Sequence, residues 1–149
     1  DQLEEFRALF GDDRQDYAAA MNAHYTNGAP MDWREHYVTA YATMHPWEDW
    51  AESWAHYLHV VDTLETAYAF GLKVDPRLNV DESLTKTIDF NAYRQADFDE
   101  LIDTWLPLTF AINSLNRSMG QPDLYPFILS QPAIQKLRFI HETIRHFKL

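Results

Sequence analysis

Apolar residues recur along most of the chain at spacings of three and four positions, which is the period of helices that pack on one side. With few glycines and little alternation, the pattern gives almost no indication of strands. It predicts an all-α fold, an irregular bundle of about six helices in a single domain over 1–149. The helices are expected at about 3–10, 17–27, 33–44, 46–70, 98–119 and 132–147.

Glycines and prolines set most of the expected helix ends. Gly11, Gly28, Gly71 and Gly120 each follow a periodic stretch, as helix-terminating glycines do. Pro46 suits the first position of a helix, and the residue before a proline avoids the helical region. Between the fourth and fifth helices, residues 72–96 are polar and aperiodic, which predicts a long loop with either a functional or an irregular structural role.

Composition narrows the class of protein. The 149 residues carry 12 Lys and Arg against 23 Asp and Glu, a formal charge of −11. This charge argues against nucleic acid and anionic membranes as partners, and no apolar run is long enough for a membrane span. Without cysteine, disulfides and thiolate metal sites are excluded. We expect a cytoplasmic protein whose chain here begins inside a longer sequence, because it starts with neither Met nor a targeting signal.

Six ionisable residues fall on one side of the expected helix 46–70. At about 100° per residue they lie within about 100° of one another, opposite a row of tryptophans. We call them the ionisable stripe: His45, Glu48, Asp49, Glu52, His56 and His59. No Lys or Arg lies between Arg34 and Lys73, so this helix has no cation of its own. Carboxylate oxygens and imidazole nitrogens are also the ligands of hard-to-borderline metals.

The residues alone leave the role of the ionisable stripe open. Acidic residues are favoured in the first turn of any helix, which accounts for Glu48 and Asp49 without a metal. His56 and His59 could equally be buried and hydrogen-bonded. A second histidine pair, His141 and His146, resembles the HExxH motif but is one residue too long, so its rings lie roughly 140° apart on a helix. We expect these two histidines at the surface.

Two segments carry a resemblance to a known family. The runs HYVTAYATMHPWEDWAESWAHYLHVVDTLETAYAFGL (36–72) and WLPLTFAINSLNRSMGQPDLYPFILS (105–130) resemble the C-terminal part of a bacterial family of putative zinc-binding metallopeptidases. The resemblance covers essentially all 149 residues. It implies a cysteine-containing zinc ribbon and a helix with HExGH upstream of Asp1, and neither is found in this chain.

The resemblance implies roles for residues near Glu48. In zincins whose third zinc ligand is a later glutamate, that residue is often followed one turn on by a second one, and EDWAE (48–52) matches this pattern. Glu48 is then the expected ligand and Glu52 the expected support for a ligand histidine, although their order could be reversed. Asp49, His56 and His59 would lie around the metal ligands and interact with them without binding the metal. Tyr41 and His45 are candidate donors to an oxyanion, with a core role open for Tyr41.

Two functions follow from these expectations. In the first, the chain is the C-terminal helical portion of a zinc-dependent metallopeptidase that acts on peptides or proteins. It supplies Glu48 and part of the substrate cleft, and as a fragment it is inactive and binds no zinc tightly. In the second, it is a non-catalytic helical domain for protein binding or scaffolding. We expect the fragment to form a homodimer or to associate with the missing N-terminal segment, because the absent helix would leave apolar surface exposed.

Overall fold

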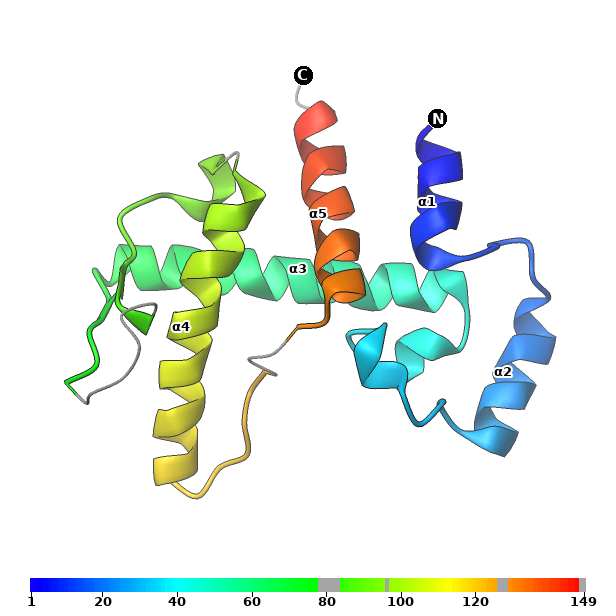
Figure 1. Cartoon of the computed structure of the whole chain (residues 1–149), viewed down its shortest axis with the longest axis horizontal. Coiled ribbons are helices and arrows are strands. Elements are labelled where there is room, and N and C mark those ends of the chain that lie inside the picture. Colours follow the sequence, from blue (N-terminus) through cyan, green and yellow to red (C-terminus); the bar gives the residue numbers. More distant parts are fainter. Residues whose placement is uncertain (78–83, 96, 126–128, 148–149) are drawn as a thin grey trace. The chain divides into compact units, whose positions relative to one another are not determined.

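The structure is a computed structural model, and it describes residues 1–77, 84–95, 97–125 and 129–147. Within these ranges the chain is predominantly helical (Figure 1). The α-helices are α1 (Gln2–Phe10), α2 (Tyr17–Asn27), α3 (Pro46–Ala69), α4 (Phe98–Ser118) and α5 (Gln131–His146). The predicted all-α class is confirmed. None of the helices in the described part of the chain is long and apolar enough to cross a membrane.

The helix ends are close to those that the sequence predicts. The Asp16 and Ser130 side chains accept hydrogen bonds from the amides of Ala19 and Ala133, so they cap the first turns of α2 and α5. Gly11 directly follows α1 with φ at 99°, a left-handed value that favours glycine. These devices act within a few residues, which is why the sequence predicts them well.

The third predicted helix, at about 33–44, is wrong. The segment forms two separate 3₁₀ turns, η1 (Trp33–Glu35) and η2 (Tyr41–Thr43). The Thr39 hydroxyl accepts a hydrogen bond from the Ala42 amide at 3.1 Å, an interaction that competes with a continuous helix. The His36 carbonyl, which a helix would use internally, instead accepts a hydrogen bond from Lys136 Nζ at 2.9 Å.

The predicted loop at 72–96 contains short regular elements. Strand β1 (Lys73–Val74) pairs antiparallel with β2 (Lys86–Thr87), with Lys73 opposite Thr87, and a 3₁₀ turn, η4 (Ala92–Arg94), follows. These strands were not predicted, because two residues are too few to show alternation. Residues 78–83 and 96 of the predicted loop lie outside the described part of the chain.

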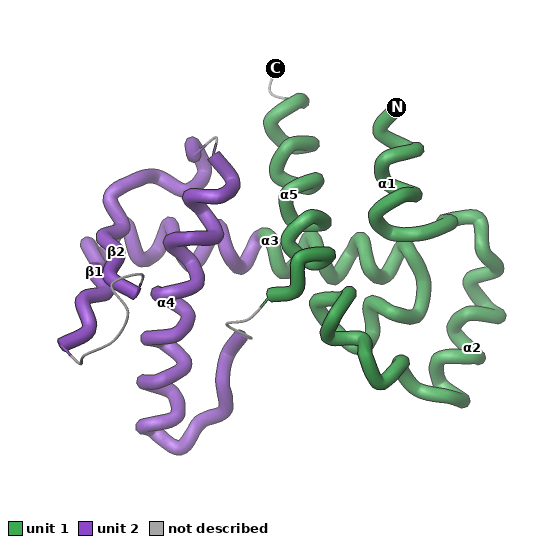
Figure 2. The backbone as a smooth tube through the Cα atoms, in the orientation of Figure 1, with its two compact units in different colours: residues 1–57, 129–149 green, residues 58–128 purple. Residues whose placement is uncertain are grey.

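The chain divides into two compact units (Figure 2). Unit 1 comprises residues 1–57 and 129–149, and unit 2 comprises residues 58–128. Helix α3 contributes its first half to unit 1 and its second half to unit 2. The expectation that 1–149 folds as a single domain stays a prediction.

Aromatic rings and aliphatic side chains form the interior of unit 1. Phe10 contacts the rings of Phe6, Trp50 and Phe139 at centroid distances between 4.9 and 6.1 Å. Helix α5 adds a buried stripe, which consists of Ala133, Leu137, Ile140 and His141. Helices α1 and α5 thus pack around the first half of α3.

The interior of unit 2 is mainly aliphatic and is built on α3 and α4. Its fully buried side chains include Val60, Leu64, Leu101 and Trp105. Asn113 is also buried and holds the segment after α4, because its Nδ2 donates to the Tyr125 carbonyl at 2.6 Å and its Oδ1 accepts from the Leu124 amide at 3.0 Å.

Candidate metal-ligand site

Glu48 lies in the first turn of α3, and the start of this helix is firmly fixed. Pro46 begins the helix, and the His45 ring caps it, since Nδ1 of His45 accepts a hydrogen bond from the Trp47 amide at 3.1 Å. An accepting Nδ1 requires the proton of a neutral ring to be on Nε2, which lies 3.2 Å from the Gln15 carbonyl and donates to it. Both ring nitrogens of this buried histidine are therefore engaged.

The carboxylate of Glu48 is half-buried and is held from one side. The Tyr17 hydroxyl donates a hydrogen bond to Glu48 Oε1 at 2.6 Å. The Tyr17 ring also contacts the rings of His45 and Trp47, at centroid distances of 5.2 and 5.9 Å. Within the described residues, no hydrogen bond or ion pair engages Oε2 of Glu48. The first turn of α3 thus presents a fixed carboxylate with one oxygen available.

Tyr41, a predicted oxyanion donor, belongs to the same cluster. The hydrogen bond to Glu48 raises the pKa of Tyr17, with smaller contributions of the same sign from burial and from Tyr41. Tyr41 also packs its ring against His24 at 5.9 Å. The structure therefore brings Tyr41, Tyr17 and Glu48 together in unit 1, from three different segments of the chain.

Asp49 points into the interior of unit 1 and has a cationic partner. Its Oδ2 lies 2.6 Å from Lys136 Nζ on α5, and both side chains are at most 5% exposed. Burial raises the pKa of Asp49 to about 6, although Lys136 and a hydrogen bond from Ser53 act in the opposite direction. Helix α3 has no cation of its own, and the cation beside Asp49 comes from another helix.

The remaining members of the ionisable stripe differ in burial. Glu52 is half-buried and His56 is buried. His59 is exposed in unit 2, where its ring lies 5.3 Å from that of Tyr125. No group of three or more His, Asp or Glu side chains in the described ranges could hold a metal ion. The stripe is therefore not a ready-made metal site, and its assigned roles stay predictions.

His141 corrects a second expectation. It is 1% exposed rather than at the surface, and its Nδ1 lies 2.9 Å from the Tyr57 hydroxyl. It lies one turn after Leu137 on the buried stripe of α5, a position that its sequence spacing already indicated. His146 is exposed, as predicted.

Sequence reasoning missed two residues of the site. The sequence pattern could have indicated a buried Lys136, because this residue lies between Ala133 and Leu137 on the apolar stripe of the last helix. A lysine in such a position needs a partner. Tyr17 had none, because its contact with Glu48 joins positions 31 residues apart.

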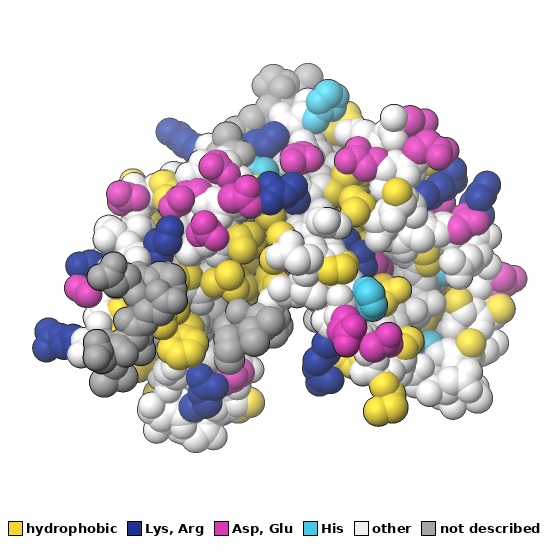
Figure 3. All heavy atoms as spheres, in the orientation of Figure 1, with side chains coloured by type: hydrophobic (Ala, Val, Ile, Leu, Met, Phe, Trp, Pro, Cys, Tyr) yellow, Lys and Arg dark blue, Asp and Glu magenta, His cyan; other side chains and the backbone are white. Residues whose placement is uncertain are grey.

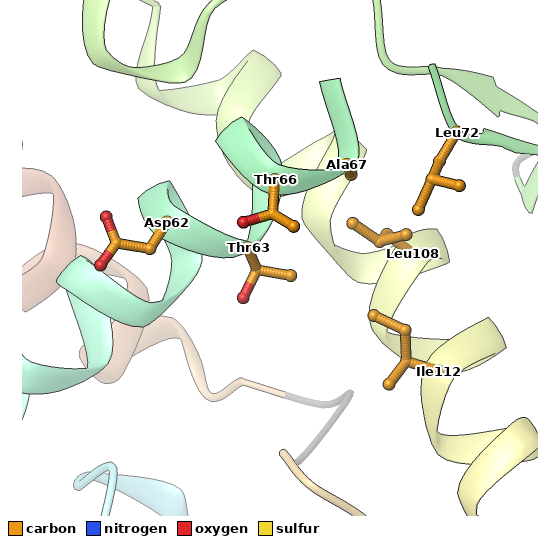
Figure 4. Close-up of a pocket in the computed structure, with 7 residues that line it drawn as sticks. All are labelled: Asp62, Thr63, Thr66, Ala67, Leu72, Leu108 and Ile112. Carbon is orange, nitrogen blue, oxygen red and sulfur yellow. The ribbon is translucent and has the colours of Figure 1, made fainter. Parts of the chain in front are cut away.

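Each unit contains a pocket of a few hundred cubic ångströms, about 280 Å³ in unit 1 and about 290 Å³ in unit 2. The pocket in unit 1 is lined by α2, by residues on either side of α2 and by the residues just before α3, among them Gln15, His24, Thr43 and Met44. The pocket in unit 2 has Asp62, Thr63 and Thr66 of α3 on one side and Leu108 and Ile112 of α4 on the other (Figure 4). The first pocket shares unit 1 with Glu48.

Comparisons with known proteins found relatives in mycobacteria. Uncharacterised proteins from Mycobacterium bovis and from two strains of Mycobacterium tuberculosis are each 44% identical to this chain over 144 residues. The match covers 97% of this chain but only 40% of each relative, so the chain spans well under half of their length. No solved structure is significantly similar to it.

The family assignment comes from a sequence profile. The profile described as "Putative zinc-binding metallo-peptidase" matches residues 1–143, which is nearly the whole chain. We conclude that the chain belongs to this family of putative zinc-binding metallopeptidases.

Proposed function

We propose that this chain is the C-terminal helical portion of a zinc-dependent metallopeptidase and supplies Glu48 as one zinc ligand. The observation that carries the proposal is the Glu48 carboxylate, which is fixed at the start of α3 with Oε1 bonded to Tyr17 and Oε2 without a hydrogen bond from the described residues. A carboxylate oxygen held in this way is a suitable zinc ligand.

The donor set fits zinc in part. Glu48 offers one oxygen ligand, whereas the described residues contain no cluster of three ligands. In this proposal the two histidine ligands and the catalytic glutamate come from an upstream HExGH helix, as the resemblance to the metallopeptidase family implies. The relatives are long enough for such a segment, since this chain covers 40% of them. The isolated chain would therefore be inactive.

Neighbouring residues have roles in this proposal that follow from their positions. Glu52, half-buried one turn after Glu48, would accept a hydrogen bond from a ligand histidine and fix its tautomer. The Tyr41 hydroxyl would donate to the oxyanion of the substrate. His45 is less suited to that role, because both of its ring nitrogens are engaged. Bound zinc would supply Lewis-acid activation of a water molecule and of the peptide carbonyl.

The pocket in unit 1 would form part of the substrate cleft. It is lined by the end of the segment that carries Tyr41. In this pocket Thr43 Oγ1 lies 3.4 Å from Nδ1 of His24. A mixed polar and apolar lining suits a peptide, which presents both backbone amides and side chains.

Zinc content and peptide cleavage of the full-length protein test the proposal. We expect Glu48→Gln to lose the zinc of this site together with cleavage of a peptide library, because a neutral amide is a poor zinc ligand. The matched control is Glu65→Gln on the same helix, which removes a half-buried carboxylate from unit 2 and should change neither property. Wild-type zinc affinity in Glu48→Gln would overturn the proposal.

The isolated chain 1–149 gives a second test. Isothermal titration with zinc should show no tight stoichiometric binding, because one carboxylate is too few for a zinc site. Tight binding that Glu48→Gln abolishes would contradict the proposal. A full-length protein that carries HExGH, binds no zinc there and cleaves no peptide would favour the scaffolding alternative.

A further inference from the structure

Helix caps fix both sides of the contact between Tyr17 and Glu48. Asp16 caps α2 directly before Tyr17, and its side chain accepts from the Ala19 amide at 2.8 Å. His45 fixes the start of α3 two residues before Trp47. The contact therefore joins the first turns of two capped helices.

The ring of Tyr17 is held on two sides. It stacks on Trp47 with an interplanar angle of 27° and meets His45 edge-on at 64°. His45 is itself held at both ring nitrogens. A phenol fixed in this way has little freedom to leave Glu48, and its 2.6 Å contact has the length of a hydrogen bond between a hydroxyl and a carboxylate.

The direction of this hydrogen bond has a consequence for Glu48. The hydroxyl donates and Oε1 accepts, so the bond restrains Oε1, whereas Oε2 has no hydrogen bond from the described residues. A tyrosine hydroxyl carries its proton at neutral pH, so the donor is retained. A freely rotating carboxylate would lose side-chain entropy when it bound a metal, whereas an oriented one loses less.

We infer that Tyr17 is a positioning residue for the zinc ligand Glu48: it holds Oε1 so that Oε2 is presented to the metal. This inference rests on the proposed function. Removal of a residue that hydrogen-bonds to a metal ligand commonly weakens metal binding by about 10- to 100-fold.

The test compares two tyrosine variants of the full-length protein. Tyr17→Phe removes the hydroxyl that bonds to Glu48. The control Tyr93→Phe removes a hydroxyl that donates to Asp62, another carboxylate of α3, also 31 residues away in the sequence but in unit 2. We expect Tyr17→Phe to raise the zinc Kd, measured by chelator competition, by about 10- to 100-fold, and Tyr93→Phe to leave it unchanged.

Two further readouts separate positioning from general destabilisation. The Tm of the zinc-free protein should shift equally little in both variants. The d–d absorption spectrum of the cobalt-substituted protein should change in Tyr17→Phe only, since its ligand geometry is altered. An upstream zinc ribbon, which the resemblance implies, would contain neither tyrosine and so would serve as an internal reference.

The outcomes distinguish this inference from the proposed function. If Glu48→Gln loses the zinc but Tyr17→Phe binds it with wild-type affinity, the positioning role is wrong and the ligand assignment stands. If Glu48→Gln keeps wild-type affinity, both are wrong. A weaker affinity in Tyr17→Phe accompanied by a matching fall in the Tm of the zinc-free protein would also overturn the positioning role.

Discussion

Asp49 and Lys136 place opposite charges inside unit 1, where neither has water to solvate it. Their 2.6 Å contact and the hydrogen bond from Lys136 to the His36 carbonyl satisfy groups that would otherwise be costly to bury. Sequence reasoning grouped Asp49 with the other carboxylates of the ionisable stripe. Only the partner on α5 shows that this residue has a structural role in unit 1.

Breaking this pair should destabilise the fold strongly. We expect Lys136→Met to lower the free energy of unfolding by about 3–5 kcal/mol, because it leaves the buried Asp49 carboxylate without its partner. Asp49→Asn should cost less, because it removes a charge that burial disfavours. The double variant should recover much of that loss, since no buried charge remains. Urea unfolding of all three variants measures the effect.

An exposed pair provides the control for this prediction. Lys73 and Asp75 lie 2.9 Å apart with both side chains more than half exposed. Removing that pair with Asp75→Asn should change stability by less than about 1 kcal/mol. Additive losses in the Asp49 and Lys136 double variant would show that the two buried groups do not act as a pair.

The raised pKa of Asp49 predicts that the stability contributed by this group falls as the pH rises. Its value in the folded state, about 6, exceeds the ordinary value of 3.8, so the folded state binds more protons than the unfolded state between these pH values. The stabilising contribution of this group is therefore fully present below about pH 4 and is lost as the pH rises through 6. The Asp49 carboxyl carbon should titrate near pH 6 in an NMR experiment, and a midpoint near 4 would contradict this.

At the scale of the element, the sequence of α3 does not indicate which side of this helix is buried. The tryptophans and the charged residues lie on opposite sides of the helix, and this pattern alone does not say which side packs inward. In the structure Asp49, Ser53 and His56 are buried, while Trp47 is 51% exposed. Helical periodicity predicts the helix itself. Which of its sides is buried depends on the side chains of α1 and α5 that pack against it.

The cap at the start of α3 is also testable. His45→Ala should lower the free energy of unfolding by about 1–2 kcal/mol, because it removes a helix cap and leaves the Gln15 carbonyl without its donor. His45→Asn should recover part of this loss, since asparagine is a good cap but is too short to satisfy Gln15 as well. Chemical denaturation compares the variants, and equal stability of Ala and Asn would argue against a capping role.

At the scale of the molecule, the excess of acidic residues affects stability as well as the choice of partners. The formal charge is −11, and acidic and basic side chains are interspersed on the face shown in Figure 3. Interspersed charges of both signs favour solubility, whereas the net excess produces repulsion within the folded state.

Salt should therefore stabilise the chain. Raising NaCl from about 0.01 M to 0.15 M shortens the screening length from about 30 to 8 Å, which weakens repulsion between exposed carboxylates. We expect the Tm to rise. The buried pair of Asp49 and Lys136 is screened much less, so Asp49→Asn should show the same salt dependence as the wild type. A Tm that falls with NaCl would show that attractive pairs outweigh the net repulsion.

The sequence by itself determined the all-α class, the ends of the long helices and Glu48 as a ligand candidate. Helix periodicity, Pro46, Gly11 and the capping residues act within a few positions, so their effects are visible in the sequence. The tertiary structure decided which side of α3 is buried, the break at Thr39, the partner of Asp49 and the contact of Tyr17 with Glu48. Each of these depends on side chains from other segments of the chain, and the energy of such contacts exists only after the chain has folded.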